Sequence, residues 1–187
     1  LYILISKIII YILSPSETPY LLYGMKPAET TETIPQPLIN KHSVQILRSK
    51  NEYEGVEFTY SFWMYIESIP TNETKDFFSV FHKGSDKLGE DGNGLYGHNN
   101  SPGVYLYKGK RNLSDNLQDK YPVLGMLVRL NVYQNTEHTE RPFKYYDDVF
   151  IDGIPIKKWV GVVIRLTSQN IVDIYINGNL TKRHKLS

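Results

Sequence analysis

The sequence contains no cysteine and carries almost no excess charge. Without cysteine, disulfide bonds and thiolate metal sites are excluded. The 21 Lys and Arg residues nearly balance the 20 Asp and Glu residues, which leaves a formal net charge of +1. The chain therefore has no global positive field to attract a polyanion, and nucleic acid is not an expected partner.

Compact catalytic motifs are also missing. No Glu-x-Asp-x-x-Glu spacing is present to align the two carboxyl groups of a glycan hydrolase on one strand. The nearest acids, Asp147, Asp148 and Asp152, are expected to be solvated loop residues, because neighbouring strand positions face opposite ways and Asp152-Gly153 is typical of a turn. The histidines lack zinc-site spacing, and no Gly-x-Ser-x-Gly motif occurs. We therefore expect a protein that is not an enzyme.

The sequence does contain a clear strand pattern at 57–67, EFTYSFWMYIE. Large apolar or aromatic side chains occupy every second position from Phe58 to Ile66, which is the period of a β-strand. The intervening positions begin polar and become aromatic at Trp63 and Tyr65. This strand is expected to have a core on one face and a partly covered second face, which predicts sheet packed on sheet.

Four further segments have the length and residue types of strands, namely 104–107, 124–133, 159–166 and 171–176. Asn177-Gly178 supplies the positive backbone angles of a tight turn, so 159–182 is predicted to form three consecutive antiparallel strands. No helical period is evident beyond residue 40. With 187 residues, 41% of them hydrophobic, the chain is long enough for one all-β sandwich.

The order of these segments resembles that of the laminin-G-like, concanavalin A-like jelly-roll superfamily. The resemblance covers residues 43–187 and depends on EFTYSFWMYIE (57–67), VFHKG (80–84), SPGVYLY (101–107), IDGIPIKKWVGVVIRL (151–166) and VDIYINGNL (172–180). It implies an all-β, two-sheet antiparallel jelly-roll sandwich. Similar proteins with an amino-terminal hydrophobic segment are encoded by large DNA viruses of algae and protists. The resemblance therefore implies a membrane-associated minor capsid protein of a virion, with other coat proteins or glycans as partners.

A different class of protein on the same fold stays open. A secreted, extracellular carbohydrate-binding lectin or a glycan-active enzyme is the alternative, since a fold does not decide function. A carboxylate pair in a cleft would distinguish the enzyme from a recognition module.

The chain divides into a hydrophobic segment at 1–13, a linker at 14–40 and the jelly-roll domain at 41–187. A helix over 1–13 would reach only about 20 Å, short of the ~30 Å hydrocarbon core of a bilayer. A membrane anchor, a remnant of a signal peptide and a buried strand or helix are the open interpretations. The linker repeats Pro among Thr and Glu, which predicts an extended tether.

Both ends of the chain prompt an expectation. Because the chain begins at Leu1, we expect the hydrophobic segment to continue upstream. The resemblance implies further strands after Ser187, or coverage of the last edge by another segment.

Several aromatic side chains are candidate ligand contacts, because they stack on sugar rings, cover a partner protein or form a second packed layer. They are Trp63, Tyr65, Tyr105, Tyr107 and Tyr133.

A glycine-rich loop at 84–100 is either a solvated loop or a calcium site, since it offers hard oxygen ligands on a flexible backbone. No other cofactor is expected. The candidate ligands are Asp86, Glu90, Asp91 and Asn93. Four Asn-x-Ser/Thr sequons are either chance occurrences or glycosylation sites of a secreted chain. Their acceptor residues are Asn72, Asn99, Asn112 and Asn179.

Overall fold

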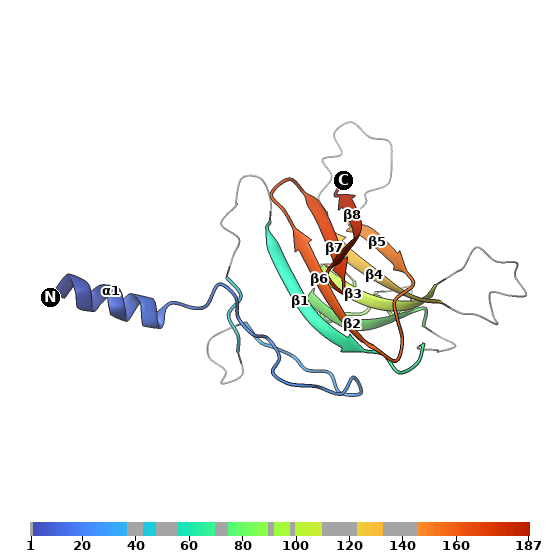
Figure 1. The fold of residues 1–187 in the computed structure, drawn as a ribbon, viewed down its shortest axis with the longest axis horizontal. Helices are drawn as coiled ribbons and strands as arrows, with labels where there is room; N and C mark the ends of the chain where they lie inside the picture. The colour runs from blue at the N-terminus through green and yellow to red at the C-terminus, as the bar shows by residue number, and fades with distance from the viewer. Residues whose placement is uncertain are drawn as a thin grey trace, which may run out of the picture. The chain divides into compact units, whose positions relative to one another are not determined.

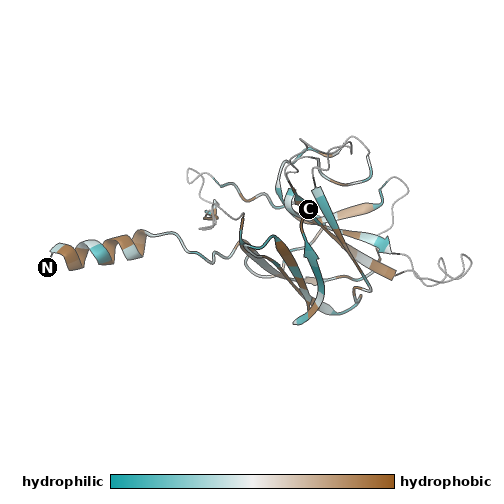
Figure 2. Ribbon diagram, turned by 90° about the horizontal axis from the view of Figure 1, so that it is seen from above, coloured by the Kyte–Doolittle hydropathy of each residue, from teal (hydrophilic) through white to brown (hydrophobic). Residues whose placement is uncertain are grey.

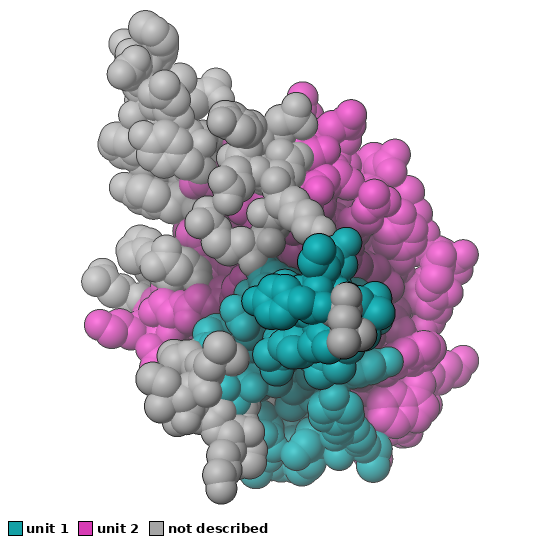
Figure 3. Space-filling model, turned by 90° about the vertical axis from the view of Figure 1, so that its left-hand side faces the viewer, with its two compact units in different colours: residues 1–50 teal, residues 51–187 magenta. Residues whose placement is uncertain are grey.

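A computed structural model describes residues 2–36, 43–47, 56–69, 75–89, 92–97, 100–109, 123–132 and 146–187. The chain forms two compact units, unit 1 (Leu1–Lys50) and unit 2 (Asn51–Ser187), which have different colours in Figure 3. The two units are described one at a time.

Unit 1 contains one helix, α1 (Tyr2–Leu13), among its described residues. The Ser14 amide and hydroxyl both donate to the Ile10 carbonyl, at 2.9 and 2.7 Å, and Pro15 then disfavours a further helical turn. Figure 2 colours much of α1 as apolar, and none of its residues is buried. The hydrophobic segment is therefore an exposed helix in this structure and not a buried strand. No described helix has the length and apolar character needed to cross a bilayer.

Unit 2 consists of two four-stranded antiparallel sheets in its described part (Figure 1). Sheet A has the order β1-β6-β7-β8, with β1 (Phe58–Tyr65), β6 (Trp159–Leu166), β7 (Ile171–Ile176) and β8 (Asn179–Lys185). Sheet B has the order β2-β3-β4-β5, with β2 (Phe77–Gly84), β3 (Asn100–Gly109), β4 (Val123–Asn131) and β5 (Tyr146–Asp152). The mostly β, antiparallel architecture predicted from the sequence is confirmed, as are the three consecutive strands over 159–182.

The main core lies between the two sheets and follows the period of two. In β6, Val160, Val162 and Ile164 are completely buried, while the residues between them are not. Sheet B contributes Val104 and Met126 from β3 and β4. Burying one such side chain stabilises the fold by about 1.5–3 kcal/mol, so this cluster is the main source of stability of unit 2.

Strand β5 corrects the expectation that Asp147 and Asp148 are solvated loop acids. Its inward positions are Asp147, Val149 and Ile151, all of them buried. Aspartate has a low strand propensity, which hid this alternation in the sequence. The strand accepts both acids because each has a hydrogen-bond partner, Ser187 for Asp147 and Arg129 for Asp148.

A second, smaller core covers the outer face of sheet B. Residues 87–89 and 92–97 lie antiparallel to each other, with the Gly97 amide donating to the Lys87 carbonyl at 2.8 Å and a β-bridge between Leu88 and Tyr96. This turn brings Leu95 against Tyr105 and Leu127, and all three side chains are buried. The outer face of sheet B is therefore covered near β3, whereas the sequence left that question open.

Candidate functional site

Among the described residues of unit 2, an exposed aromatic cluster lies on the outer face of sheet A. Strand pairing places Trp63 of β1 opposite Gly161 of β6, and Tyr65 opposite Trp159. The three aromatic residues are 67%, 48% and 50% exposed for Trp63, Tyr65 and Trp159 respectively. We call these three side chains the aromatic platform. Large aromatic side chains held at a surface in this way are typical of binding sites.

Trp63 lies flat on the sheet because its neighbour is a glycine. A Cβ atom on Gly161 would lie 3.2, 3.2 and 3.3 Å from the Cη2, Cζ2 and Cζ3 atoms of the indole. Similar distances to three consecutive ring atoms mean that the ring face covers the glycine. The opposite ring face is left to solvent.

Two hydrogen bonds with Asn177 hold the backbone of Gly161 beneath Trp63. The Asn177 side-chain Oδ1 accepts a hydrogen bond from the Gly161 amide at 2.9 Å, and the Asn177 amide donates to the Gly161 carbonyl at 2.8 Å. Beside this point the rings of Tyr65 and Trp159 lie 5.7 Å apart at 57°. The platform therefore stands on a rigid strand pair, which reduces the entropy lost on binding.

The immediate neighbours of Trp63 on the outer face of sheet A carry no charge at neutral pH. The outward positions of β1 are Thr59, Ser61 and the two platform residues, and β6 adds Gly161 and Val163 next to Trp159. The next outward residue of β6 is Arg165, which lies opposite Thr59 at the end of β1 away from Tyr65. A ligand that fits this surface has to be neutral where it touches the rings, because burying an unpaired charge is costly.

Farther across the outer face of sheet A, on β7 and β8, lies a charged pair formed by Asp173 and Arg183. Arg183 of β8 donates from Nε and Nη2 to the two carboxylate oxygens of Asp173, at 2.6 and 2.9 Å. These hydrogen bonds hold the pKa of Asp173 below its ordinary value, with the charges of Arg183 and Arg165 acting in the same direction against the effect of burial.

This pair predicts a pH-dependent contribution to stability. Because the pKa of Asp173 is lower in the folded chain than in the unfolded chain, the contribution is fully present above the ordinary pKa of 3.8 and is lost as the pH falls through the folded pKa. We expect Asp173→Asn to lower the free energy of unfolding at pH 7 and the difference from wild type to shrink below pH 3.8. Urea denaturation over a pH series measures it. A difference that stays constant down to the lowest pH would contradict the assignment.

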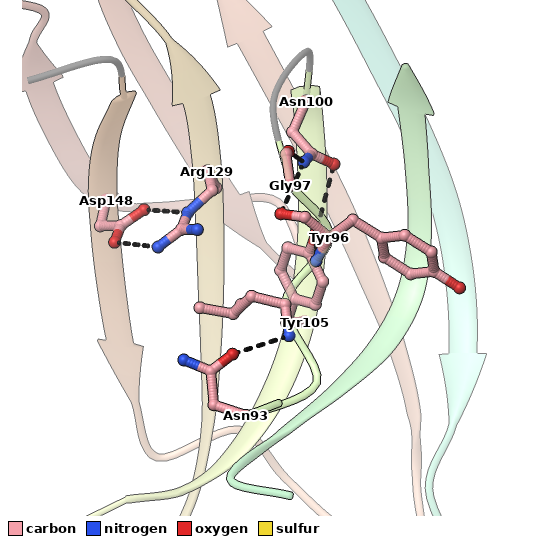
Figure 4. A network of polar contacts seen from close by, with 8 residues as sticks. Asn93, Tyr96, Gly97, Asn100, Tyr105, Arg129 and Asp148 are labelled. Atoms are coloured by element: carbon pink, nitrogen blue, oxygen red, sulfur yellow. Dashed lines mark hydrogen bonds and ion pairs between the residues drawn. The ribbon is translucent and has the colours of Figure 1, made fainter. Parts of the chain in front are cut away.

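On sheet B, Tyr105 is part of a buried polar network and not of a surface, which corrects its role as a candidate ligand contact. Its side chain is 0% exposed, and its hydroxyl donates to Asn100 Oδ1 at 3.1 Å while accepting from the Tyr96 amide at 3.3 Å (Figure 4). The Asn100 amide group in turn donates to the carbonyls of Tyr96 and Gly97. Burial raises the pKa of Tyr105.

An ion pair between the buried Arg129 and the partly exposed Asp148 lies beside this network (Figure 4). Arg129 of β4 donates from Nε and Nη2 to the two carboxylate oxygens of Asp148 on β5, both at 2.8 Å. Arg129 is only 8% exposed, and its guanidinium carbon lies 3.7 Å from the centre of the Tyr146 ring. Although burial acts to lower the pKa of Arg129, its hydrogen bonds and charge interaction with Asp148 raise it. The guanidinium is therefore permanently charged and matched by Asp148.

Tyr107 is half-buried, and both its hydroxyl group and its ring contact other residues of sheet B. Its hydroxyl donates to Asp152 Oδ1 at 2.9 Å, and its ring lies over Gly125, where a Cβ atom would clash with it. The ring also contacts Phe150 edge to face, at 5.5 Å and 84°. Burial, and then the hydrogen bond to Asp152, raise the pKa of Tyr107. This tyrosine stabilises the strands of sheet B and does not extend the platform.

Asp147 faces the opposite side of β5 from Asp148. Its carboxylate is buried and accepts from the amide and the hydroxyl of Ser187, at 2.7 and 2.9 Å, with His184 Nε2 at 3.6 Å. Adjacent acids on one strand therefore point to different faces, as the sequence predicted for a strand. They do not form the paired carboxylates of a hydrolase cleft.

The remaining candidate residues are dispersed. Asp86 is exposed, and the Asn93 side-chain oxygen accepts from the Leu95 amide at 3.1 Å. Among the described residues, no three His, Cys, Asp or Glu side chains gather to hold a metal ion. Asn179 is exposed at the start of β8. The other calcium, sequon and aromatic candidates lie outside the described residues, namely Glu90, Asp91, Asn72, Asn99, Asn112 and Tyr133.

Trp159 was not among the residues that the sequence singled out for binding. Its place beside Tyr65 depends on the register between β1 and β6, strands that are far apart in the chain. The available signal was that Trp159 and Gly161 share one face of their strand.

Comparisons with models of protein families, with curated proteins and with solved structures found no match to this chain. What the fold and the site define is thus a class: a two-sheet antiparallel β-protein with an exposed, uncharged aromatic platform on one sheet.

Proposed function

We propose that unit 2 is a non-enzymatic recognition module that binds glycans through the aromatic platform. The observation that carries this proposal is the indole of Trp63, which lies flat on Gly161 and is 67% exposed. A pyranose ring has a face of C–H groups of similar size to an aromatic ring. Stacking the two removes apolar surface from water without requiring any charge on the protein.

The residues around Trp63 favour binding of an oligosaccharide over binding of a single sugar. Tyr65 and Trp159 lie at the end of the same two strands, so a second ring of an extended glycan would meet a second aromatic surface. Thr59 and Ser61 offer exposed hydroxyl groups on the other side of Trp63. An uncharged surface with aromatic and hydroxyl groups suits a neutral polysaccharide.

The absence of catalysis is part of the proposal. Asp147 and Asp148 face opposite sides of β5, and Ser187 and Arg129 respectively occupy their carboxylates. The jelly-roll connectivity and the setting are proposed on the sequence resemblance: a membrane-associated minor capsid protein of a large DNA virus, held near the membrane by its amino-terminal segment. The exposed apolar surface of α1 supports membrane proximity.

We expect Trp63→Ala to weaken glycan binding by at least about tenfold, equivalent to 1.4 kcal/mol, because it removes the central stacking surface. Affinity electrophoresis of the full chain in gels that contain neutral β-glucan, xylan or mannan measures binding, and titration calorimetry on the best ligand gives the affinity. Gly161→Ala should weaken binding less, since a Cβ atom at 3.2 Å displaces the ring without removing it.

Phe150→Ala is the matched control. Phe150 is an aromatic residue on the other sheet and is 48% exposed, as is Tyr65, so its loss should leave glycan binding unchanged. Glycan chain length should also stay constant during incubation. If glycan binding is unchanged in Trp63→Ala, the glycan binds at another surface. If the glycan is cleaved and Asp148→Asn abolishes the cleavage, the protein is an enzyme.

A further inference from the structure

We infer that β1 is the strand through which two copies of this chain associate, edge to edge, about a two-fold axis. This proposal concerns the backbone edge of sheet A and does not depend on a glycan ligand. It follows from a comparison of the four edge strands in the described part of unit 2, which are β1 and β8 in sheet A and β2 and β5 in sheet B.

Three of the four edges carry features that discourage pairing with another strand. β8 contains Lys182, Arg183 and Lys185, and β5 carries the inward-pointing Asp147 and the exposed Asp152. β2 is interrupted by two register shifts, between Ser79 and Phe81 and between His82 and Gly84. Charge of one sign and irregular geometry are the usual protections of an exposed edge.

β1 has neither protection. Its eight residues, FTYSFWMY, include no charged side chain, and its pairing with β6 runs through all of them without a register shift. Among the described residues, β6 is its only strand neighbour. A long, regular and uncharged edge presents backbone donors and acceptors that another extended strand satisfies.

The core-facing side chains of β1 lead to the same conclusion. Phe58, Phe62 and Met64 pack against the main core but stay partly exposed, whereas the paired positions of β6 are buried. Phe62 reaches Phe81 of β2, with ring centres 5.2 Å apart, at the open side of the sandwich. An added strand beside β1 would complete the burial of this row.

Electrostatics favours a second copy as the occupant. Antiparallel pairing of a strand with its own copy brings each residue close to a residue of the same strand, so a charged edge repels itself and an uncharged edge does not. Of the edge strands that the structure describes in unit 2, only β1 meets this condition with a regular backbone. If the copies pair with their faces aligned, the outward Ser61 and Thr59 of each copy lie near the axis, and the two sheets A become one continuous sheet.

Lysine on the outer face of β1 tests this arrangement. Thr59 and Ser61 are exposed, so Thr59→Lys/Ser61→Lys should keep the fold while setting four positive charges near the axis, with only a small loss of stability because position 59 lies opposite Arg165. Sedimentation equilibrium of the full chain should show a dimer for the wild type. The dissociation constant should rise at least about tenfold in the variant. Asn179→Lys/Thr181→Lys adds the same charge to the exposed edge strand β8 and should leave the dimer intact.

Because the chain has no cysteine, a single introduced cysteine can test by disulfide cross-linking whether the two-fold axis lies at β1. Ser61→Cys should give a disulfide-linked dimer on mild oxidation, and Thr181→Cys on β8 should not. A monomeric wild type would overturn the proposal, as would a dimer that survives the β1 lysines or a cross-link that forms only through Thr181→Cys. Slow hydrogen exchange of β1 amides in a monomer would indicate instead that another segment of the same chain covers this edge.

Discussion

Replacing Asp148 with asparagine is expected to lower the free energy of unfolding by about 3–5 kcal/mol, because it leaves the buried guanidinium of Arg129 without a counter-charge. Arg129 is 8% exposed and donates two hydrogen bonds of 2.8 Å to the Asp148 carboxylate. Asparagine has one acceptor oxygen and no charge, so one bond is lost and the remaining positive charge stays buried. Urea denaturation at pH 7 measures the loss.

Asp173→Asn provides the matched control. It breaks another carboxylate–arginine pair of unit 2, but the side chain of Arg183 is 61% exposed, so water solvates the released charge. The loss of stability should therefore be smaller than for Asp148→Asn. The double variant Arg129→Met/Asp148→Leu should recover most of the stability, since it removes both charges together. Equal losses in the two single variants would show that Arg129 is not effectively buried.

Tyr105→Ala is expected to lower the free energy of unfolding by about 3–5 kcal/mol, the usual cost of deleting a buried aromatic side chain. Tyr105 is 0% exposed and packs with Leu95 and Leu127 in the small core on the outer face of sheet B. Its removal leaves a cavity and detaches the turn at 87–97 from the sheet. Thermal and urea denaturation of the full chain measure the loss.

Two other variants separate packing from hydrogen bonding and from ligand contact. Tyr105→Phe keeps the ring but leaves the Tyr96 amide and Asn100 Oδ1 without the hydroxyl, which should cost about 1–3 kcal/mol. Trp63→Ala, at a residue that is 67% exposed, should change stability by about 0.5 kcal/mol or less. The reverse order, with Trp63→Ala the most destabilising, would make the platform a structural element and not a binding surface.

The sequence alone was sufficient to predict the strands of sheet A and the hairpin turn between β7 and β8. The alternation in 57–67 predicted which face of β1 packs on the core, and Asn177 and Gly178 have φ angles of 51° and 83°, as an Asn-Gly hairpin turn requires. These features depend on neighbours in the chain, because side-chain alternation and turn geometry are local properties of the backbone.

The candidate site could not be predicted in the same way, because it depends on contacts between strands that local sequence patterns do not specify. Trp63 and Tyr105 both stand on outward strand faces, yet the first is exposed and the second completely buried, because the turn at 87–97 covers sheet B. Likewise, Trp159 joins Tyr65 only through the register of β6 on β1, and Asp148 meets Arg129 only through the register of β5 on β4. A period of two separates the faces of a strand. Which face is covered, and by what, is decided by pairing between segments far apart in the chain.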